Sequence, residues 1–157
     1  MDDLEYSDSV VVAASPEQLY DMVADVTRMG EWSPICKACW WEDDPGGPRE
    51  GAWFGGRNVT PERTWETRSL VVAADRGREF AFQVLGDWVR WGYTFEPVDG
   101  GTRVTESWQF LPGGQAGYRE RFGDEAEARL ELRKGQMREG IRATLNAIKA
   151  AAESQRP

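Results

Sequence analysis

One carboxyl group is a candidate for proton chemistry because of its position in an apolar strand. Glu106 interrupts an alternation of apolar residues, and its neighbours on the same strand face are Val104, Trp108 and Phe110. Alternate residues of a strand share a face, so Glu106 should point into the interior. A carboxyl group among aromatic rings has a raised pKa and can act as a general acid or base. The alternative is that a tyrosine or an arginine satisfies the carboxyl group and Glu106 only fixes the packing.

Tyr93 is the second candidate, because two predicted hairpins place it opposite Glu106. Two-residue turns at 86–87 and 99–100 would set the register of both hairpins. The facing pairs are then Phe82 with Trp91, Phe80 with Tyr93, Trp91 with Trp108, Tyr93 with Glu106, and Phe95 with Val104. The two registers are assigned separately, yet they agree on one apolar face. Tyr93 can donate a hydrogen bond to a ligand carbonyl or stabilise an enolate; alternatively, it is a core residue whose hydroxyl bonds to Glu106.

Apolar side chains would form the rest of such a site. The candidate ligand-binding residues are Phe80, Phe82, Trp91, Tyr93, Phe95, Glu106, Trp108, Met137, Ile141 and Leu145. The same residues form an ordinary core if the interior is completely filled, and the sequence leaves both alternatives open.

Several other chemistries are excluded or not expected. The chain contains no histidine, which excludes Ser-His-Asp triads, Cys-His dyads and imidazole metal sites. Cys36 and Cys39 are the only cysteines, too few for a structural zinc site. In a strand predicted at 35–42 they would point to opposite faces, so neither a disulfide nor a redox role is expected. Loop solvation and helix capping explain the acidic pairs at 43–44 and 124–125. No phosphate loop, dinucleotide fingerprint or nucleophile elbow is present, and no metal or cofactor is predicted.

A strand predicted at 63–74 can face either way. One parity sends Trp65, Thr67, Ser69 and Val71 inward, and the other sends Glu66, Arg68, Leu70 and Val72 inward. An inward Arg68 would suit a carboxylate or phenolate ligand, but charged side chains are more often solvated.

The elements that would position these residues follow from local patterns. Three valines at 10–12 mark a strand at 6–14. Ser15, Pro16 and Gln18 then predict a capped helix start, followed by a second short helix at 26–32. Further strands are predicted at 35–42, 51–59 and 63–74, before the two hairpins, and 111–123 is predicted as a linker. In the last hairpin Glu96 should meet Arg103 as an exposed ion pair.

The last long segment, 124–153, predicts a single amphipathic helix. One face of its 3.6-residue repeat carries Leu130, Met137, Ile141, Leu145, Ile148 and Ala152. Asp124 and Glu127 have the spacing of a capping box. The helix would be roughly 40 Å long and needs a large curved surface to lie on.

Length and charge limit the remaining possibilities. The 157 residues fit one domain, 1–157, and the net charge is −8 without a run of basic residues. A nucleic-acid partner is therefore not expected. No apolar segment is long enough to span a bilayer, and the N-terminus lacks the pattern of a signal peptide. A cytoplasmic protein is expected, either monomeric or homodimeric.

Three segments carry a family resemblance. They are ASPEQLY at 14–20, DVTRMGEWSP at 25–34 and FEPVDGGTRVTESW at 95–108. With the terminal helix, they resemble the START/Bet v 1-like (SRPBCC) superfamily, in its polyketide cyclase/dehydrase and lipid-transport branch, and actinobacterial members in particular. The resemblance implies an α+β helix-grip fold: a curved seven-stranded antiparallel sheet around a long C-terminal helix, with two short helices after the first strand. In this fold the space between sheet and helix is often a ligand cavity.

The function expected from these observations is the binding or transport of a hydrophobic small molecule, polyketide-like or lipid-like, between sheet and helix. Its entrance is expected near 29–32, the glycines at 55–56 and the linker. The alternative is a cyclase/aromatase-like enzyme that uses Glu106 and Tyr93 for proton transfer. A third alternative is a surface interaction module of the co-chaperone type without a ligand, which a large exposed apolar patch would favour.

Overall fold

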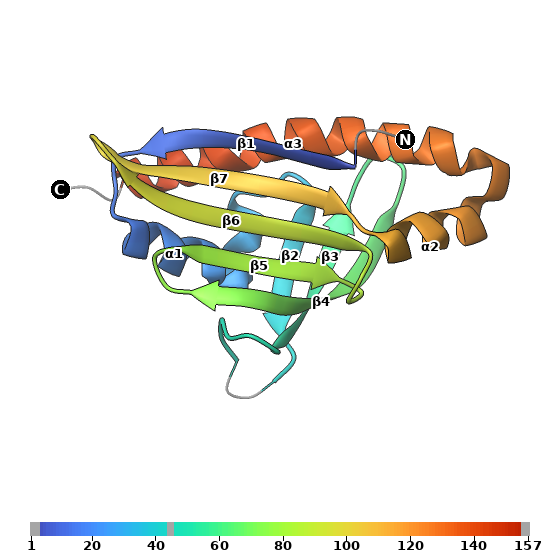
Figure 1. The fold of residues 1–157 in the computed structure, drawn as a ribbon, viewed down its shortest axis with the longest axis horizontal. Helices are drawn as coiled ribbons and strands as arrows, with labels where there is room; N and C mark the ends of the chain where they lie inside the picture. The colour runs from blue at the N-terminus through green and yellow to red at the C-terminus, as the bar shows by residue number, and fades with distance from the viewer. Residues whose placement is uncertain (1–3, 44–45, 155–157) are drawn as a thin grey trace.

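The computed structural model, which describes residues 4–43 and 46–154, contains a seven-stranded antiparallel sheet (Figure 1). The strand order is β1-β7-β6-β5-β4-β3-β2. The strands are β1 (Glu5–Val12), β2 (Cys36–Trp41), β3 (Trp53–Val59), β4 (Thr64–Asp75), β5 (Glu79–Val84), β6 (Val89–Val98) and β7 (Gly101–Phe110). From β2 to β7 every strand pairs with the next one in sequence, and β1 returns to pair with β7.

The helices lie at the two ends of the chain. They are α1 (Pro16–Ala24), the 3-10 helix η1 (Val26–Glu31), α2 (Pro112–Phe122), the 3-10 turn η2 (Gly123–Glu125) and α3 (Ala126–Ser154). As predicted, Ser15 caps α1 by accepting a hydrogen bond from the backbone N–H of Gln18. None of the described helices is both long and apolar enough to cross a bilayer.

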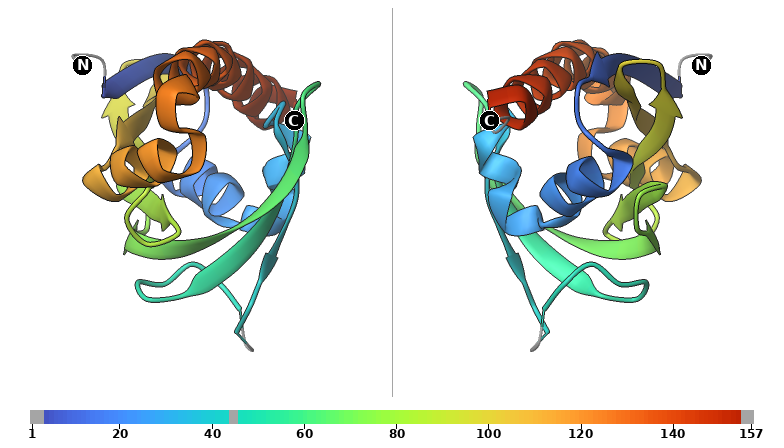
Figure 2. Two further views of the ribbon diagram at one scale, coloured as in Figure 1. Left: turned by 90° about the vertical axis from the view of Figure 1, so that its right-hand side faces the viewer. Right: turned by 90° about the vertical axis from the view of Figure 1, so that its left-hand side faces the viewer.

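The long helix α3 lies across the opening of the curved sheet (Figure 2). Its predicted apolar face is the buried one: Leu130, Met137, Ile141, Leu145, Ile148 and Ala152 are all buried. The helix-grip architecture expected from the resemblance is therefore confirmed. The predicted capping box at 124–127 is not, because the 3-10 turn η2 leads directly into α3.

The predicted registers of both hairpins are confirmed. The β5–β6 pairing sets Phe82 opposite Trp91, and the β6–β7 pairing sets Tyr93 opposite Glu106. Glu96 and Arg103 form the expected ion pair at 2.8 Å. The first turn is longer than predicted, because pairing stops at 84 and 89 and leaves residues 85–88 unpaired. On β4 the first of the two parities holds: Ser69 and Val71 are buried, whereas Arg68 is exposed and bonds to Glu42.

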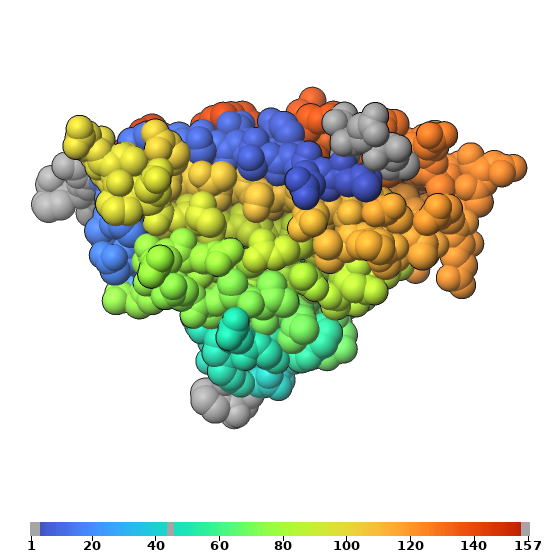
Figure 3. All heavy atoms as spheres, viewed as in Figure 1, coloured from blue at the N-terminus to red at the C-terminus, as the bar shows by residue number. Residues whose placement is uncertain are grey.

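The segment 111–123, predicted as a linker, contains the helix α2. Its glycines hide the helical signal, because glycine is a poor helix former. Contacts with the turn at 85–88 explain them: a Cβ atom on Gly114 would lie 2.4 Å from the backbone oxygen of Trp88, and one on Gly117 would lie 2.2 Å from its ring. Together with the start of α3, α2 protrudes beyond the end of the sheet (Figures 1 and 3).

One end of the interior is solid. The ring of Tyr20 on α1 makes edge contacts with Phe80 and Phe95, at 6.3 and 5.9 Å between centroids. The side chains of Leu145 and Ile148 are fully buried in the same core cluster. The other end, towards α2, is hollow.

Candidate functional site

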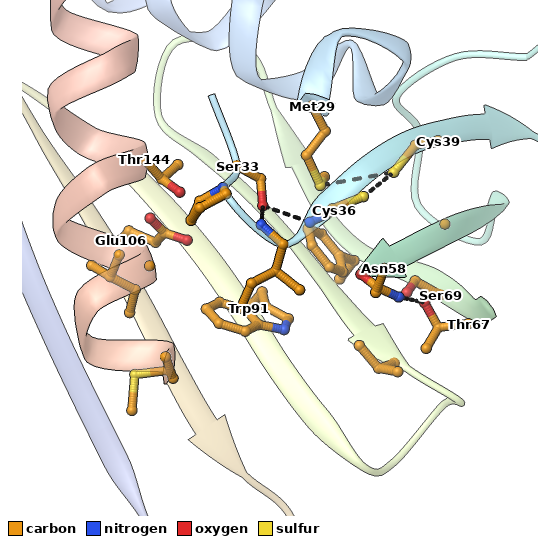
Figure 4. A pocket seen from close by; sticks show the side chains of 18 of the residues that line it. Met29, Ser33, Cys36, Cys39, Asn58, Thr67, Ser69, Trp91, Glu106 and Thr144 are labelled. Atoms are coloured by element: carbon orange, nitrogen blue, oxygen red, sulfur yellow. Dashed lines mark hydrogen bonds between the residues drawn. The ribbon is translucent and has the colours of Figure 1, made fainter. Parts of the chain in front are cut away.

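A cavity of about 90 Å³ lies between the concave face of the sheet and α3. Strands β2 to β7, the segment 29–36 and α3 contribute its walls (Figure 4). The apolar part of the lining includes Phe54, Phe82, Trp91, Met137 and Ile141. The polar part includes Ser33, Asn58, Thr67, Ser69, Glu106 and Thr144. We call this cavity the inner pocket.

Glu106 is the acid of the inner pocket. Its carboxyl group is buried, and Oε2 accepts a 3.0 Å hydrogen bond from the hydroxyl of Tyr93. Oε1 has no hydrogen-bond partner among the described residues. Burial raises the pKa of Glu106 to about 8, against a smaller opposing effect of the Tyr93 hydrogen bond. Near neutral pH this group is therefore mostly protonated and can donate a hydrogen bond into the cavity.

Tyr93 keeps its proton under the same conditions. Burial raises the pKa of its hydroxyl well above the ordinary value, and the neighbouring Glu106 raises it further. Tyr93 therefore acts as a hydrogen-bond donor that holds one oxygen of Glu106 and leaves the other for a ligand.

A wider pocket of about 800 Å³ continues from the inner one towards α2. Six residues line both spaces and form a neck between them: Asn58, Thr67, Val84, Trp91, Arg133 and Gln136. This outer pocket lies between the turns at 60–63 and 85–88, α2, and the first turns of α3. Its aromatic lining includes Trp65, Trp88, Trp108, Tyr118 and Phe122. Two of the exposed large apolar residues, Leu85 and Leu132, also belong to it.

The wide mouth differs in part from the expected entrance. The segment 111–123 does line it, as expected. Met29 and Gly56 line the inner pocket instead, and the ring of Trp40 occupies the space beside Gly55, where a Cβ atom would lie 2.5 Å from that ring.

The structure brings together most of the residues singled out in the sequence. Six of them line the inner pocket: Phe82, Trp91, Tyr93, Glu106, Met137 and Ile141. Trp108 lines the outer pocket. Phe80, Phe95 and Leu145 line neither of these two pockets. For these three the expectation of a ligand wall is corrected, because α1 packs on this end of the sheet and their side chains fill the solid core.

The expectation for the cysteine pair is also corrected. Both thiols line the inner pocket, with Sγ atoms 3.0 Å apart, and Sδ of Met29 lies 3.8 Å from Cys39 Sγ (Figure 4). A bulge between Cys36 and Ala38 adds one residue to β2 and so turns both cysteines to the same side. The contact with Cys39 lowers the pKa of Cys36, whereas the contact with Cys36 and burial raise that of Cys39.

Arg133 and Thr144 are among the residues of α3 that line the site and were missed in the sequence. Arg133 and Thr144 lie four residues before and seven residues after Met137, so helical spacing places both on the buried stripe. The signal in the sequence is that a charged residue and a hydroxyl residue occupy positions on an otherwise apolar face of the helix.

Comparison with known proteins assigns the family. Residues 3–153 match the model of the family described as polyketide cyclase/dehydrase and lipid transport. No curated protein matches the chain. The Polyketide_cyc-like protein Cgl2372 from Corynebacterium glutamicum is 47% identical, with a TM-score of 0.73, over 99% of this chain and 95% of that one.

More distant structures share the fold. A START superfamily protein from Mycobacterium smegmatis is 16% identical with a TM-score of 0.70, over 97% of this chain and 99% of that one. The di-domain ARO/CYC StfQ from the steffimycin biosynthetic pathway is 18% identical with a TM-score of 0.68, over 97% of this chain and 51% of that one. From the family match over nearly its whole length, the chain belongs to the polyketide cyclase/dehydrase and lipid-transport family.

Proposed function

We propose that this protein binds a hydrophobic small molecule, ring-bearing or lipid-like, that extends from the outer pocket through the neck into the inner pocket. The observation that carries the proposal is a buried carboxyl oxygen, Glu106 Oε1, left without a described partner in a mostly apolar cavity. Buried polar groups are normally hydrogen-bonded. A ligand carbonyl or hydroxyl would satisfy this one.

The size and composition of the two pockets support the proposal. Small-molecule sites are mostly apolar, with a few convergent polar groups, and typically enclose ~300–1,000 Å³. The outer pocket, at about 800 Å³, falls in that range. The inner pocket, at about 90 Å³, suits one end of a ligand rather than the whole molecule.

Native mass spectrometry of protein purified from its own host tests the proposal, followed by denaturing extraction of the bound material. We expect a stoichiometric hydrophobic adduct. Thr144→Phe, which fills the inner pocket from α3, should remove the adduct. Ala143→Phe adds the same ring at the neighbouring exposed position and should retain it. Protein free of adduct in all three forms, with no uptake of added lipid or polyketide extracts, would contradict the proposal.

A second candidate function is acid–base catalysis on such a ligand, as in a cyclase or aromatase. It is favoured by the pKa of about 8 for Glu106, which allows the group both to donate and to accept a proton near neutral pH. Glu106 would exchange the proton with the ligand at Oε1, and Tyr93 would hold Oε2 in place. Once a compound that turns over is found, unchanged turnover by Glu106→Gln would exclude this role.

A further inference from the structure

Arg133 stands at the neck between the two pockets, and no carboxylate within residues 4–43 and 46–154 forms an ion pair with it. It lines both spaces. Its Nη1 atom is buried and donates no hydrogen bond within the part of the chain that the structure describes. Burial lowers the pKa of this guanidinium, although an arginine keeps its charge in a protein. A partly buried charge whose buried nitrogen has no described partner is costly, so the neck favours a molecule that brings the opposite charge.

The walls around this residue are also rich in positive charge. Arg63, Arg121 and Arg129 line the outer pocket together with Arg133, against two carboxylates, Glu62 and Glu66. Glu62 already accepts a 3.1 Å hydrogen bond from Gln136. The protein as a whole has a net charge of −8, so the mouth differs in sign from the rest of the molecule. Such a patch attracts anions to the pocket.

The remaining arginines of the mouth are held against aromatic rings. Arg63 lies over Trp65 at 4.4 Å, and Arg121 lies over Trp88 at 5.7 Å from the ring centroid. These stacked pairs form walls that suit a flat apolar body. Arg133 makes no such contact in the described structure, and its planar group is the one left to form paired hydrogen bonds with an oxyanion.

We infer that the ligand carries an oxyanion, in the simplest case a carboxylate, which binds to Arg133 while its apolar body lies against the aromatic walls. This inference rests on the proposed function and adds the chemical class of the ligand. Glu106 marks the other end of the site. Glu106 lines the inner pocket alone, whereas Arg133 lines both pockets. The ligand therefore places an oxyanion at the neck and a hydrogen-bonding oxygen near Glu106.

Three probes with one ring system test the charge preference: naphthoate, naphthylmethanol and naphthylmethylammonium. Binding is measured by calorimetry and by quenching of tryptophan fluorescence at fixed pH and ionic strength. We expect the native protein to bind naphthoate about tenfold or more tightly than the alcohol, and the ammonium probe most weakly.

Substitutions test whether Arg133 causes the preference for naphthoate over the alcohol. Arg133→Met should reduce the ratio between naphthoate and the alcohol to about twofold or less, because binding of naphthoate weakens far more than binding of the alcohol. Arg133→Lys should keep an intermediate ratio, because it retains the charge without the paired geometry. Arg119→Met, at an exposed position of α2 that lines neither of the two pockets, is the matched control and should change the ratio less than about threefold, as exposed charges are screened. Thermal melts check that each variant is folded.

The outcomes separate the two proposals. Equal binding of naphthoate and alcohol by the native protein would overturn the oxyanion inference and leave the proposed function standing. A full charge preference in folded Arg133→Met would also overturn the inference, because the oxyanion would then bind elsewhere. If none of the three probes binds, the inference fails, and the native mass-spectrometry result decides the proposed function separately.

Discussion

The hydroxyl of Tyr93 donates a hydrogen bond to one oxygen of Glu106, while the other oxygen of the same carboxyl group is buried without a described partner. The two residues are direct cross-strand neighbours in the β6–β7 pairing. The cavity thus contains a carboxyl group that is satisfied on one side only, and low dielectric makes such a group sensitive to every change around it. It links the pH to both stability and binding.

The first prediction concerns the stability of Glu106→Gln as a function of pH. The carboxyl group has an ordinary pKa of 4.5 and a folded-state pKa of about 8. Between these values the folded state retains a proton that the unfolded chain has released, so the free energy of unfolding falls as the pH rises. The slope approaches ~1.4 kcal/mol per pH unit. Because glutamine does not titrate, the free energy of unfolding of Glu106→Gln does not show this fall with pH.

Urea denaturation of both proteins between about pH 5 and pH 9 measures the effect. The stability of the variant relative to the native protein should increase up to about pH 8 and then level off. Parallel stability curves for the two proteins across this range would show that Glu106 titrates normally.

The second prediction concerns Tyr93→Phe. Loss of the hydroxyl removes the remaining hydrogen bond of Glu106, so the pKa of the carboxyl group should rise further. The fold should lose about 1 kcal/mol, the typical net value of one hydrogen bond. Carbon-detected NMR titration of the Glu106 carboxyl group follows its pKa directly. A double-mutant cycle with Glu106→Gln isolates the pair, and a coupling energy near zero would mean that the hydrogen bond contributes nothing.

The third prediction concerns the thiol pair in the inner pocket. Because the Sγ atoms of Cys36 and Cys39 lie 3.0 Å apart, diamide should oxidise the two thiols to one intramolecular disulfide, with the two electrons and two protons passing to diamide. Intact mass spectrometry should show the loss of two hydrogen atoms, at a rate independent of protein concentration. Cys36→Ser should give no such product. Formation of mixed adducts or dimers only would show that the pair does not approach closely in solution.

The fourth prediction compares two glycine positions in helices. Gly114→Ala in α2 would place a methyl group 2.4 Å from the backbone oxygen of Trp88, so α2 must move, at a cost of about 1–3 kcal/mol. Gly135→Ala in α3 meets no atom within 4 Å, and it should stabilise the fold by about 0.5–1 kcal/mol. Urea denaturation of both variants measures the difference, and equal effects would refute the close contact of α2.

The sequence predicts the register of Tyr93 and Glu106 because two turns and a period of two fix it independently. It does not predict the pairing of Cys36 with Cys39, since one bulged residue on β2 reverses the face of everything that follows. The helix α2 is also missed from local sequence. Gly114 and Gly117 lower the helix propensity of this segment, but a side chain at either position would collide with Trp88.

The hollow part of the interior is not predictable from residue types alone. Phe80 and Phe82 lie on the same strand with similar chemistry, yet Phe80 is in the solid core and Phe82 lines the inner pocket. The difference comes from α1, whose Tyr20 packs on Phe80, whereas none of the described side chains fills the space beside Phe82. Only the three-dimensional packing shows which part of the interior the side chains leave unfilled.

The division of α3 into a core half and a pocket half has a consequence for how such proteins diverge. Leu145, Ile148 and Ala152 belong to the hydrophobic core and line neither of the two pockets. Arg133 and Gln136 line both pockets and do not belong to the core. Foldability and ligand choice are thus encoded in separate turns of one helix. A lineage can exchange the residues of the first few turns and acquire a new ligand while the last turns keep the architecture unchanged.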